Sequence, residues 1–375
     1  MANQVGKIDE REAFVAFNLT DKVGSVKLAE LVAAAGSVSA AWDSYPDKLA
    51  RSGGEIDWRR EFAIAKRYGV EIVTPADPDY PPCLLEQTSH PLALYVKGDV
   101  SALSSSSVAI VGTRRATPYG LDQSFKIARG LAEDGWTVVS GLALGIDAEA
   151  HRGALAAEGK TVGVIGSGLD EFYPEENRAL AREIVEKGGA VVSEFPFGRY
   201  PDTQTFPQRN HTVAALARGV VAIEAPFKSG TLITTSCAAD MGRVVMAVPG
   251  RVDSRSSAGC LALIRDGARL VRSAADVEEE LSSLHEPVER KTQKAKRRPR
   301  AAGGASEAKA APEPKYSVEE AIVMREVDAE GVSMDLLIRR TGLPAEKVNA
   351  LCMSLRLKGR VRFFPGNRVA LPRDP

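Results

Sequence analysis

The sequence predicts an α/β protein with a doubly wound, parallel sheet, preceded by a small all-α domain and followed by a winged-helix domain. Three observations predict this. Short runs rich in Val, Ile and Ala alternate with helical patterns through residues 107–284, as in parallel strands covered by helices on both faces. The residues before about position 70 carry helical patterns alone. The last residues carry three helical patterns and then two strand-like runs.

Length and charge limit the kinds of protein that this chain can form. Its 375 residues are enough for two or three domains. The 49 basic residues balance 49 acidic ones, so affinity for nucleic acid must come from local patches. The first residues lack the apolar core of a signal peptide, and no apolar run approaches the roughly 18 residues of a membrane span. We therefore expect a cytoplasmic protein without a membrane partner.

The cysteines and histidines are few and dispersed. Cys83, Cys237, Cys260 and Cys352 have neither metal-ligand nor redox-pair spacing. The 4 histidines are equally scattered. We expect free thiols and no metal site.

Residues 1–75 are expected to form a compact helical domain. Leu19, Val26, Leu28 and Leu31 recur with helical spacing. The pattern resembles a sterile-alpha-motif or helix-hairpin-helix bundle, whose hairpin amides often touch nucleic-acid backbone. Because the segment is not basic, a folding or protein-contact role is favoured over that one. The Pro-rich residues 76–106 are expected to be a connector that lays extended chain against the next domain.

Residues 107–284 are expected to form the α/β domain. Its strands are expected at Val108–Val111, Thr137–Ser140, Val162–Ile165, Ala190–Ser193, Val220–Glu224, Val244–Val248 and Arg269–Val271. Its helices are expected at Leu121–Glu133, Asp147–Glu158, Asn177–Lys187, Thr212–Arg218 and Thr231–Met241.

Two segments complete the chain. Residues 285–314 lack apolar periodicity and are expected to be a basic flexible linker, whose cluster Lys291–Arg300 offers nonspecific phosphate affinity or only a solvated tether. Residues 315–375 are expected to be the winged-helix domain, with helices at 317–327, 333–340 and 345–358 and strands at 360–364 and 368–371. DNA readout is one interpretation. The apolar third helix favours protein contact or a structural role.

The turn after the first strand of the α/β domain is the first candidate site. Gly112-Thr113-Arg114-Arg115 lies where a parallel strand ends and a helix is about to begin. Ligands usually bind at this edge of such sheets. Free backbone N–H groups near a helix start favour an anion, and two adjacent arginines suit a negative ligand. The alternative is a solvated turn.

Small or anion-friendly residues follow the other strands too. The stretches are SGLALGID at 140–147, GSG at 166–168, EFPFG at 194–198 leading to TFPQRNH at 205–211, and EAPFKSGT at 224–231. Because the carboxyl ends of parallel strands meet at one edge of the sheet, we expect these loops to form a phosphate-binding rim.

The residues of these loops exclude several classes of ligand. The first turn is not a G-x-G-x-x-G pattern, and Ser140-Gly141 stands where a ribose-binding acid would follow the second strand, so no nicotinamide cofactor is expected. No P-loop sequence is present, so P-loop ATP hydrolysis is not expected. A basic rim with an aromatic suits a single nucleic-acid strand. Phe206, beside Arg209 and Asn210, is the candidate stacking residue, although it could equally be core.

Two pairs of residues have the composition of a catalytic site. Asp147 and His151 are four residues apart and could act as an orienter and a base, but a helix cap and a packed histidine explain them more simply. Glu194 and Glu224 each follow a strand and could form a glycosidase pair. We predict no catalytic residue and no enzymatic activity.

Taken together, the motifs resemble the DNA-processing protein A (DprA/Smf) family, which binds single-stranded DNA in natural transformation. The resemblance runs in order through residues 108–271 and rests on the strings AIVGTRRATPYG, VVSGLALGIDAEAHRGAL, GKTVGVIGSGLDEFYPEEN, SEFPFG, TFPQRN, SGTLITT, VMAVPGRVDS and GCLALIRDGA. The helical first segment, the connector and the winged helix fit the three-part architecture of that family.

The resemblance implies an extended Rossmann-like domain that binds single-stranded DNA, forms homodimers and helps to load RecA in transformation or DNA repair. It implies phosphate contacts at Gly112, Arg114, Gly141, Arg209, Asn210, Lys228, Ser229, Gly230 and Thr231, with Phe206 near a base. Apart from the resemblance, we expect Arg115, next to Arg114 in the turn, to be a helper on the rim. One position departs from the family. His211 stands where a third basic residue is usual, which weakens that contact or makes it depend on pH.

Two other functions are also compatible with the sequence. The SGTLITT loop is similar to the Gly-Thr loops of lysine-decarboxylase-like nucleotide phosphoribohydrolases, although Leu232 stands where those enzymes have a Glu. The second alternative function is that of a winged-helix transcription regulator with a nucleotide-sensing domain. It would require sequence-specific duplex binding by residues 315–375.

Overall fold

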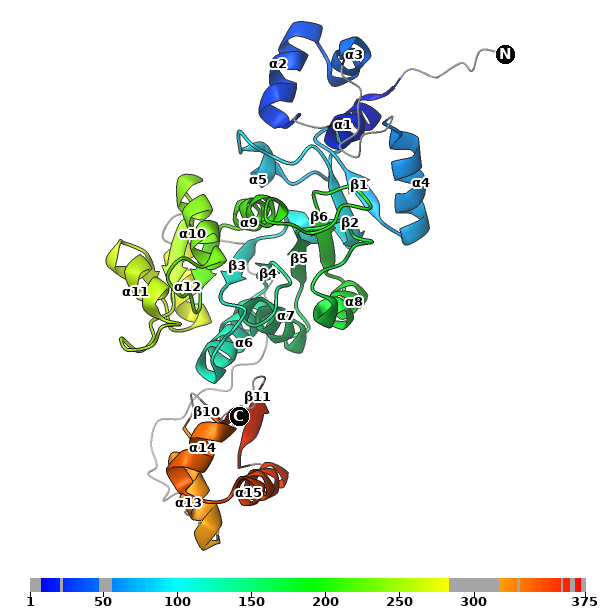
Figure 1. Ribbon diagram of the computed structural model, residues 1–375. Helices are drawn as coiled ribbons and strands as arrows, with labels where there is room; N and C mark the ends of the chain where they lie inside the picture. The colour runs from blue at the N-terminus through cyan, green and yellow to red at the C-terminus, as the bar shows by residue number, and fades with distance from the viewer. Residues whose placement is uncertain are drawn as a thin grey trace, which may run out of the picture. The chain divides into compact units, whose positions relative to one another are not determined.

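The computed structural model describes residues 8–20, 23–46, 56–282, 317–328, 331–358, 360–364 and 368–371. The chain divides into two compact units (Figure 1). The first comprises residues 1–116 and 123–288, and the second comprises residues 117–122 and 289–375. The expected linker cluster Lys291–Arg300 lies outside the described residues.

Four helices begin the first unit, and they are α1 (Glu10–Leu19), α2 (Ser25–Ala35), α3 (Val38–Ser44) and α4 (Trp58–Tyr68). A capping box starts α1, where Asp9 accepts from the backbone N–H of Glu12 and Glu12 accepts from that of Asp9. Aromatic rings fill the core between α1 and α3. Phe17 meets Trp42 edge to face with ring centroids 5.1 Å apart.

A nine-stranded sheet forms the centre of the first unit. The strands are β1 (Glu71–Val73), β2 (Leu94–Gly98), β3 (Ser107–Val111), β4 (Thr137–Ser140), β5 (Thr161–Ile165), β6 (Ala190–Ser193), β7 (Gly219–Ala222), β8 (Val244–Ala247) and β9 (Arg269–Leu270). Their order in the sheet is β1-β2-β6-β5-β4-β3-β7-β8-β9. The strands from β3 to β9 pair in parallel, as the sequence predicts.

The Pro-rich residues after α4 extend this sheet. Strand β2 pairs antiparallel with β6, with Tyr95 opposite Ser193, and β1 pairs antiparallel with β2. The short helices α5 (Pro82–Leu85) and η1 (Val100–Ser104) lie on either side of β2 along the chain. The expected connector, residues 76–106, thus contributes β2 to the sheet, whereas β1 lies within the segment that was expected to be helical.

Helices cover both faces of the sheet (Figure 1). One face packs against α5, η1, α9 (Thr205–Leu216) and α10 (Gly230–Asp240). The other packs against α7 (Ile146–Ala156) and α8 (Arg178–Glu186). Neighbouring residues of β6 point to opposite faces, since Val192 belongs to the first cluster and Val191 to the second. This two-sided burial explains the near-continuous apolar strands.

Helix α9 corrects one prediction. The helix begins at Thr205 rather than at Thr212 as expected. Asp202 accepts hydrogen bonds from the backbone N–H groups of Gln204 and Thr205, and Pro207 occupies the first turn, where its missing N–H costs nothing. Phe206, Arg209 and Asn210 consequently project from a helix instead of a loop.

Three further helices lie wholly or mainly in the first unit. The first, α6 (Pro118–Glu133), starts three residues earlier than expected. The other two, α11 (Ala258–Arg265) and α12 (Ala274–Ser282), were not predicted from sequence. A short 3₁₀ turn, η2 (Glu175–Asn177), precedes α8.

The second unit has the winged-helix arrangement that the sequence predicts. Its elements are α13 (Val318–Glu326), β10 (Val332–Ser333), α14 (Met334–Thr341), α15 (Ala345–Leu357), β11 (Arg362–Phe364) and β12 (Arg368–Ala370). The strands form a sheet in the order β10-β12-β11. Helix α15 buries Val348, Cys352 and Leu355 in the domain core, which explains the apolar residues of the presumed recognition helix.

Cys83, Cys237, Cys260 and Cys352 are free thiols. Among the described residues, no helix has the length and apolar character needed to cross a membrane.

Candidate functional site at the carboxyl edge of the sheet

The strand order creates a crevice beside β3. The chain passes from β3 to β4, β5 and β6 on one side, then returns to place β7 on the other side. Doubly wound sheets bind ligands where the order reverses, because the loops on either side of that point diverge. The loops after β3, β4 and β7 all open at this edge.

A groove of about 520 Å³ occupies this crevice. All the site residues predicted from sequence line it except Lys228. The lining residues used below are Gly112, Thr113, Arg114, Arg115, Gly141, Ala143, Asp147, Thr203, Phe206, Arg209, Asn210, Ser229, Gly230 and Thr231. Residues almost 120 positions apart in the chain are thus brought to one surface.

The turn after β3 is held by the neighbouring loops. The Thr113 N–H donates to the Glu224 carbonyl oxygen at 2.8 Å, and the Ile146 N–H donates to the Thr113 carbonyl oxygen at 3.3 Å. A Cβ at Gly112 would stand 2.5–2.7 Å from the Ile146 side chain, so only glycine allows this approach. The backbone before Arg114 is therefore fixed, while the side chains of Arg114 and Arg115 are exposed.

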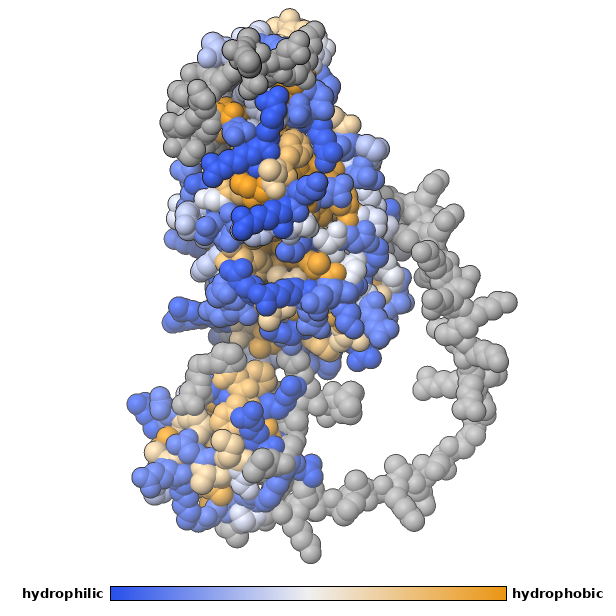
Figure 2. Space-filling view, turned by 90° about the vertical axis from the view of Figure 1, so that its right-hand side faces the viewer, coloured by the Kyte–Doolittle hydropathy of each residue, from blue (hydrophilic) through white to orange (hydrophobic). Residues whose placement is uncertain are grey.

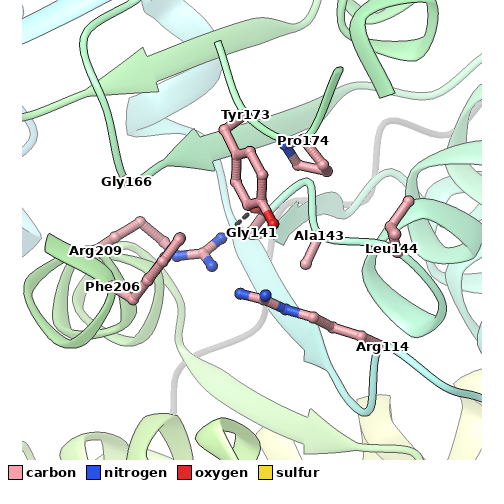
Figure 3. A pocket seen from close by; sticks show the side chains of 9 residues that line it. All are labelled: Arg114, Gly141, Ala143, Leu144, Gly166, Tyr173, Pro174, Phe206 and Arg209. Atoms are coloured by element: carbon pink, nitrogen blue, oxygen red, sulfur yellow. Dashed lines mark hydrogen bonds between the residues drawn. The ribbon is translucent and has the colours of Figure 1, made fainter. Parts of the chain in front are cut away.

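A small pocket adjoins the groove and shares Arg114, Gly141, Ala143, Phe206 and Arg209 with it. The Arg114 guanidinium carbon lies 5.2 Å from the ring centroid of Phe206. The ring of Tyr173 lies 6.1 Å from that of Phe206 at an interplanar angle of 55°. Figure 3 shows Arg114 and Arg209 entering from opposite sides and Tyr173 pointing into the same space. The pocket thus combines a cation with two aromatic rings.

Arg209 lies at the bottom of this site. Its side chain is buried, with 5 % relative exposure, and its Nη1 donates to the carbonyl oxygens of Gly141 and, at 3.1 Å, Val164. Its Nε has no hydrogen-bond partner among the described residues. Burial lowers the pKa of Arg209, and the negative charge of Asp147 opposes that effect. Arg209 therefore ties the ends of β4 and β5 together beneath the groove.

Asp147 is the buried counter-charge. Its Oδ2 accepts a hydrogen bond from the Gly141 N–H at 3.2 Å. Burial raises the pKa of Asp147, while Arg209 and the backbone N–H groups of Ala143, Gly112 and Gly141 lower it. A Cβ at Gly141 would collide with the Arg209 guanidinium and lie 2.8 Å from Asp147 Oδ2. Glycine is needed there for packing, beside any role in ligand contact.

The start of α10 forms the opposite wall. Ser229 is the residue before the helix, and its hydroxyl caps no backbone N–H. That Oγ is buried and has no hydrogen-bond partner among the described residues. Gly230 and Thr231 present the first turn of the helix to the groove. Lys228 is exposed beside them, with φ of 60°, and does not line the groove.

Asn210 and His211 follow Arg209 on α9. The Asn210 side-chain Nδ2 donates to the Gly230 carbonyl oxygen at 3.4 Å, which joins α9 to the start of α10. His211 is partly buried, and burial lowers its pKa, so the imidazole is neutral at physiological pH. It is not among the residues that line the groove or the pocket.

The two possible catalytic pairs do not form. The His151 Nδ1 lies 2.7 Å from the Thr161 hydroxyl rather than beside Asp147, and burial lowers the pKa of His151 to about 3. Glu194 and Glu224 follow β6 and β7, which have β5, β4 and β3 between them. At about 4.8 Å per strand, they lie on the order of 19 Å apart, too far for the paired carboxylates of a glycosidase.

The residues at the end of β4 bear on cofactor binding. Strand β4 ends at Ser140, whose hydroxyl donates to the Ile110 carbonyl oxygen at 2.6 Å, and no carboxylate takes the ribose-binding position. Within the described residues, no cluster of three or more His, Cys, Asp and Glu side chains has a metal-binding arrangement.

Two residues of the site carry no role in the sequence-based prediction. Tyr173 enters the pocket from the loop after β5. Asn177 is buried, and its Nδ2 donates to the carbonyl oxygens of Leu142 at 2.8 Å and Ala143 at 3.1 Å, which fixes the loop after β4. Both belong to the string EFYPEEN. That string was part of the family resemblance, but nothing in its spacing indicates that it folds over the neighbouring loop.

Comparison with protein families decides the relationship. The family model of the DNA recombination-mediator protein A matches residues 71–282, and the model of the DprA winged helix domain matches residues 307–367. The chain belongs to the DNA recombination-mediator protein A family. The groove described above lies within the first of the two matched regions, and the second confirms the winged-helix fold.

Relatives of this mediator family match over most of the chain. The protein Smf of Synechocystis sp. is 33% identical over 96% of this chain and 98% of its own length. The DNA processing protein DprA of Streptococcus pneumoniae is 43% identical over 54% of this chain and 71% of its own.

Two solved structures of the family also resemble this chain. The X-ray structure of the S. pneumoniae DprA matches with a TM-score of 0.61 and 34% identity, and covers 73% of this chain and 99% of that one. The DNA processing protein A of Helicobacter pylori matches with a TM-score of 0.51 and 29% identity, covering 57% and 96%. The description of that structure concerns its single-stranded DNA binding mode.

Proposed function

We propose that this recombination mediator binds single-stranded DNA along the groove and hands the strand to a RecA-type recombinase, without catalysing a reaction itself. The observation that carries the proposal is the character of the groove, where the exposed Arg114 and Arg115 stand opposite the first turn of α10. Cations and helix-start N–H groups bind phosphates without reading sequence. The H. pylori relative, described as binding single-stranded DNA, supports the same ligand.

The predicted site residues take three roles in this proposal. Arg114, Arg115 and Lys228 hold phosphates electrostatically. Ser229, Gly230, Thr231 and Gly112 offer backbone or hydroxyl groups along the groove, and Asn210 keeps the α10 wall in place. Phe206, with Tyr173, stacks on a base. Gly141 and Arg209 mainly shape the floor, because the Arg209 Nη1 already serves two carbonyl groups.

Arg114 is placed to combine a phosphate contact with a base contact. Its guanidinium lies over the Phe206 ring, and neither Arg114 nor Arg115 forms an ion pair with another described residue. An arginine without a carboxylate partner keeps its donors for a phosphate. A base that stacks beside Phe206 would bring its own phosphate toward this guanidinium.

RecA and a second copy of the chain are the proposed protein partners, and RecA would place this step in the cytoplasm. The surface that supports self-association is the sheet edge. Strand β9 ends the sheet, and its Leu270 is 47% exposed. An unpaired edge with an exposed leucine is a common site of association. Sedimentation at micromolar concentration with Leu270→Lys tests it: a dimer that persists in this variant argues against the edge.

The DNA-binding proposal is tested by fluorescence anisotropy with labelled oligo-dT, without ATP, over a salt series. We expect salt-sensitive binding that Arg114→Ala weakens at least about tenfold, because a hydrogen bond to a charged group contributes ~1.5–3 kcal/mol. Arg182→Ala, an exposed cation on α8, is the matched control and should bind normally. Unchanged affinity in Arg114→Ala would refute the assignment of the groove.

The same preparation separates the two alternative functions. Release of free base from a nucleoside monophosphate would favour a phosphoribohydrolase. Sequence-specific duplex binding that is lost without residues 315–375 would favour a transcription regulator. Two cations of the winged-helix domain are paired and so less available to a DNA backbone: Lys347 pairs with Glu319, and Lys358 lies 2.6 Å from Glu320, where it helps to lower the pKa of that carboxyl to about 2.

A further inference from the structure

Helix α4 carries a row of cations on one face. Arg59, Arg60, Lys66 and Arg67 are all exposed. At 3.6 residues per turn they fall within about 120° of the helix circumference, and from Arg59 to Arg67 they extend about 12 Å along its axis. None of the four forms an ion pair with a residue in the described part of the chain. Among the described residues, the row is therefore a concentrated positive surface without an ion-pair partner.

Most other cations on the helices and strand ends of the first unit form ion pairs with carboxylates. Arg129 pairs with Glu133 at 2.8 Å, Lys160 with Asp99 at 2.7 Å, and Arg178 with Glu175 at 2.7 Å. The α4 row differs because its acidic neighbour on the same helix, Glu61, points inward and is buried. In a chain whose total charge is balanced, such a row indicates a polyanionic partner.

The inward face of α4 contacts the loop between β6 and α9, which leads to the groove. Glu61 accepts a hydrogen bond from the Phe197 N–H at 2.9 Å. The ring of Tyr68 stacks on that of Phe197 with centroids 5.7 Å apart and an interplanar angle of 22°. Phe197 belongs to the loop between β6 and α9, and Thr203 of the same loop lines the groove. The six residues from Phe197 to Thr203 span at most ~20 Å.

We propose that α4 is a second contact surface for the strand that occupies the groove, so that the DNA leaves across the β6–α9 loop and its next phosphates meet the cations of α4. This inference rests on the proposed function. Tyr200 on the loop is 66% exposed and Tyr68 at the end of α4 is 45% exposed, which places two flat aromatic rings along this path.

Two further observations describe the surroundings of α4. The helix precedes residue 71, where the match to the mediator family model begins, so the surface is additional to the matched region. The face of the first unit that carries α4 is turned to the viewer in Figure 2, where strongly hydrophilic side chains run in bands between smaller apolar areas. A hydrophilic face of this kind suits a charged or polar partner better than an apolar one.

The experiment compares two pairs of neutral substitutions in the full chain. Lys66→Gln/Arg67→Gln removes two charges from α4, and Arg182→Gln/Lys187→Gln removes two exposed charges from α8. Oligo-dT of about 6 nucleotides fits the groove alone, and oligo-dT of about 30 nucleotides reaches both surfaces. Each protein is titrated with both oligonucleotides over a salt series, and circular dichroism checks that it is folded.

We expect the α4 pair to weaken binding of the long oligonucleotide and to reduce the slope of log K against log[salt] by about 1.4, because each phosphate contact on a single strand contributes ~0.7. Binding of the short oligonucleotide and the control pair should not change. Arg59→Gln/Arg60→Gln should reproduce the result and serves as the second variant if the first does not fold.

The outcomes distinguish this inference from the proposed function. An unchanged slope in both α4 variants, while Arg114→Ala still weakens binding, would overturn the inference alone. An equal loss in the α8 control would also overturn it, because the effect would then be nonspecific. Loss of binding to phosphatidylserine vesicles without any effect on the long oligonucleotide would assign the row to a membrane instead. Failure of the unmodified protein to bind either oligonucleotide would refute the proposed function.

Discussion

The rim and the floor of the groove use the same residue type for different purposes. On the rim, Arg114 and Arg115 are exposed and have no ion-pair partner among the described residues. On the floor, Arg209 is buried, bonded to two carbonyl oxygens and balanced by Asp147. All three arginines were predicted from sequence as ligand contacts or helpers.

This difference shows that a basic residue in a binding site can act mainly by stabilising the fold rather than by contacting the ligand. A buried charge that loses its partner destabilises the protein, whereas an exposed one changes stability little. Variants of the floor should therefore be detected as loss of folding stability, and variants of the rim as loss of DNA affinity with normal stability. The predictions below test that division in order of decreasing effect.

The largest effect is expected on the floor. Arg209→Ala leaves Asp147 as an uncompensated buried carboxylate and frees two carbonyl groups, so the free energy of unfolding should fall by about 3–5 kcal/mol. Urea denaturation measures it. The rim variant Arg114→Ala should remain within ~0.5 kcal/mol of the unmodified protein. Equal losses in the two variants would remove the distinction between rim and floor.

The next largest effect is a pH dependence of folding stability caused by His151, which lies one helical turn after Asp147 on α7. Burial lowers the pKa of His151 to about 3 in the folded chain, below its value of about 6.5 when unfolded. The unfolded state therefore binds more protons between these values, and stability is lost as pH falls through that window. By pH 4.5 the His151 contribution to this loss should be roughly 3 kcal/mol.

His151→Gln isolates this contribution because glutamine does not titrate. The difference in unfolding free energy between pH 7 and pH 4.5 should be smaller in the variant than in the unmodified protein by the amount above. His211→Gln is the matched control, since His211 is less buried. If both variants show the full loss on acidification, His151 is not the group responsible.

A smaller effect is expected for the aromatic residue of the pocket. Phe206→Ala should weaken binding of oligo-dT by ~1–3 kcal/mol, the contribution of one stacked base. Because this contact is not electrostatic, the slope of log K against log[salt] should be retained, in contrast to Arg114→Ala. Anisotropy titrations at several salt concentrations measure both quantities. A change of slope in Phe206→Ala would mean that the ring acts mainly by holding Arg114.

The smallest effect is expected at His211. Burial lowers the pKa of His211, which disfavours its charged form, and the residue does not line the groove. His211→Gln should therefore change the affinity for oligo-dT by less than about twofold at pH 7.5 and at pH 6.0, well below a single charged contact. A gain in affinity on acidification that disappears in the variant would restore the pH-dependent contact that the sequence suggests.

Much of the fold could be predicted because its signals are local. Every strand expected between residues 107 and 271 is present. The prediction failed at the start of α9, where Pro207 hides a first helical turn that is stabilised by Asp202. It also missed the strand pairing of β2 with β6, because pairing joins residues that lie about a hundred positions apart.

The sequence by itself determined that a positive, aromatic-containing surface would form at one edge of a parallel sheet. Strand polarity guarantees this, because every loop that follows a parallel strand emerges at the same edge. Only the tertiary structure decided which of those residues face a ligand. Burial of Arg209, the three strands between Glu194 and Glu224, and the entry of Tyr173 from the loop after β5 all depend on strand order and packing, which local spacing does not encode.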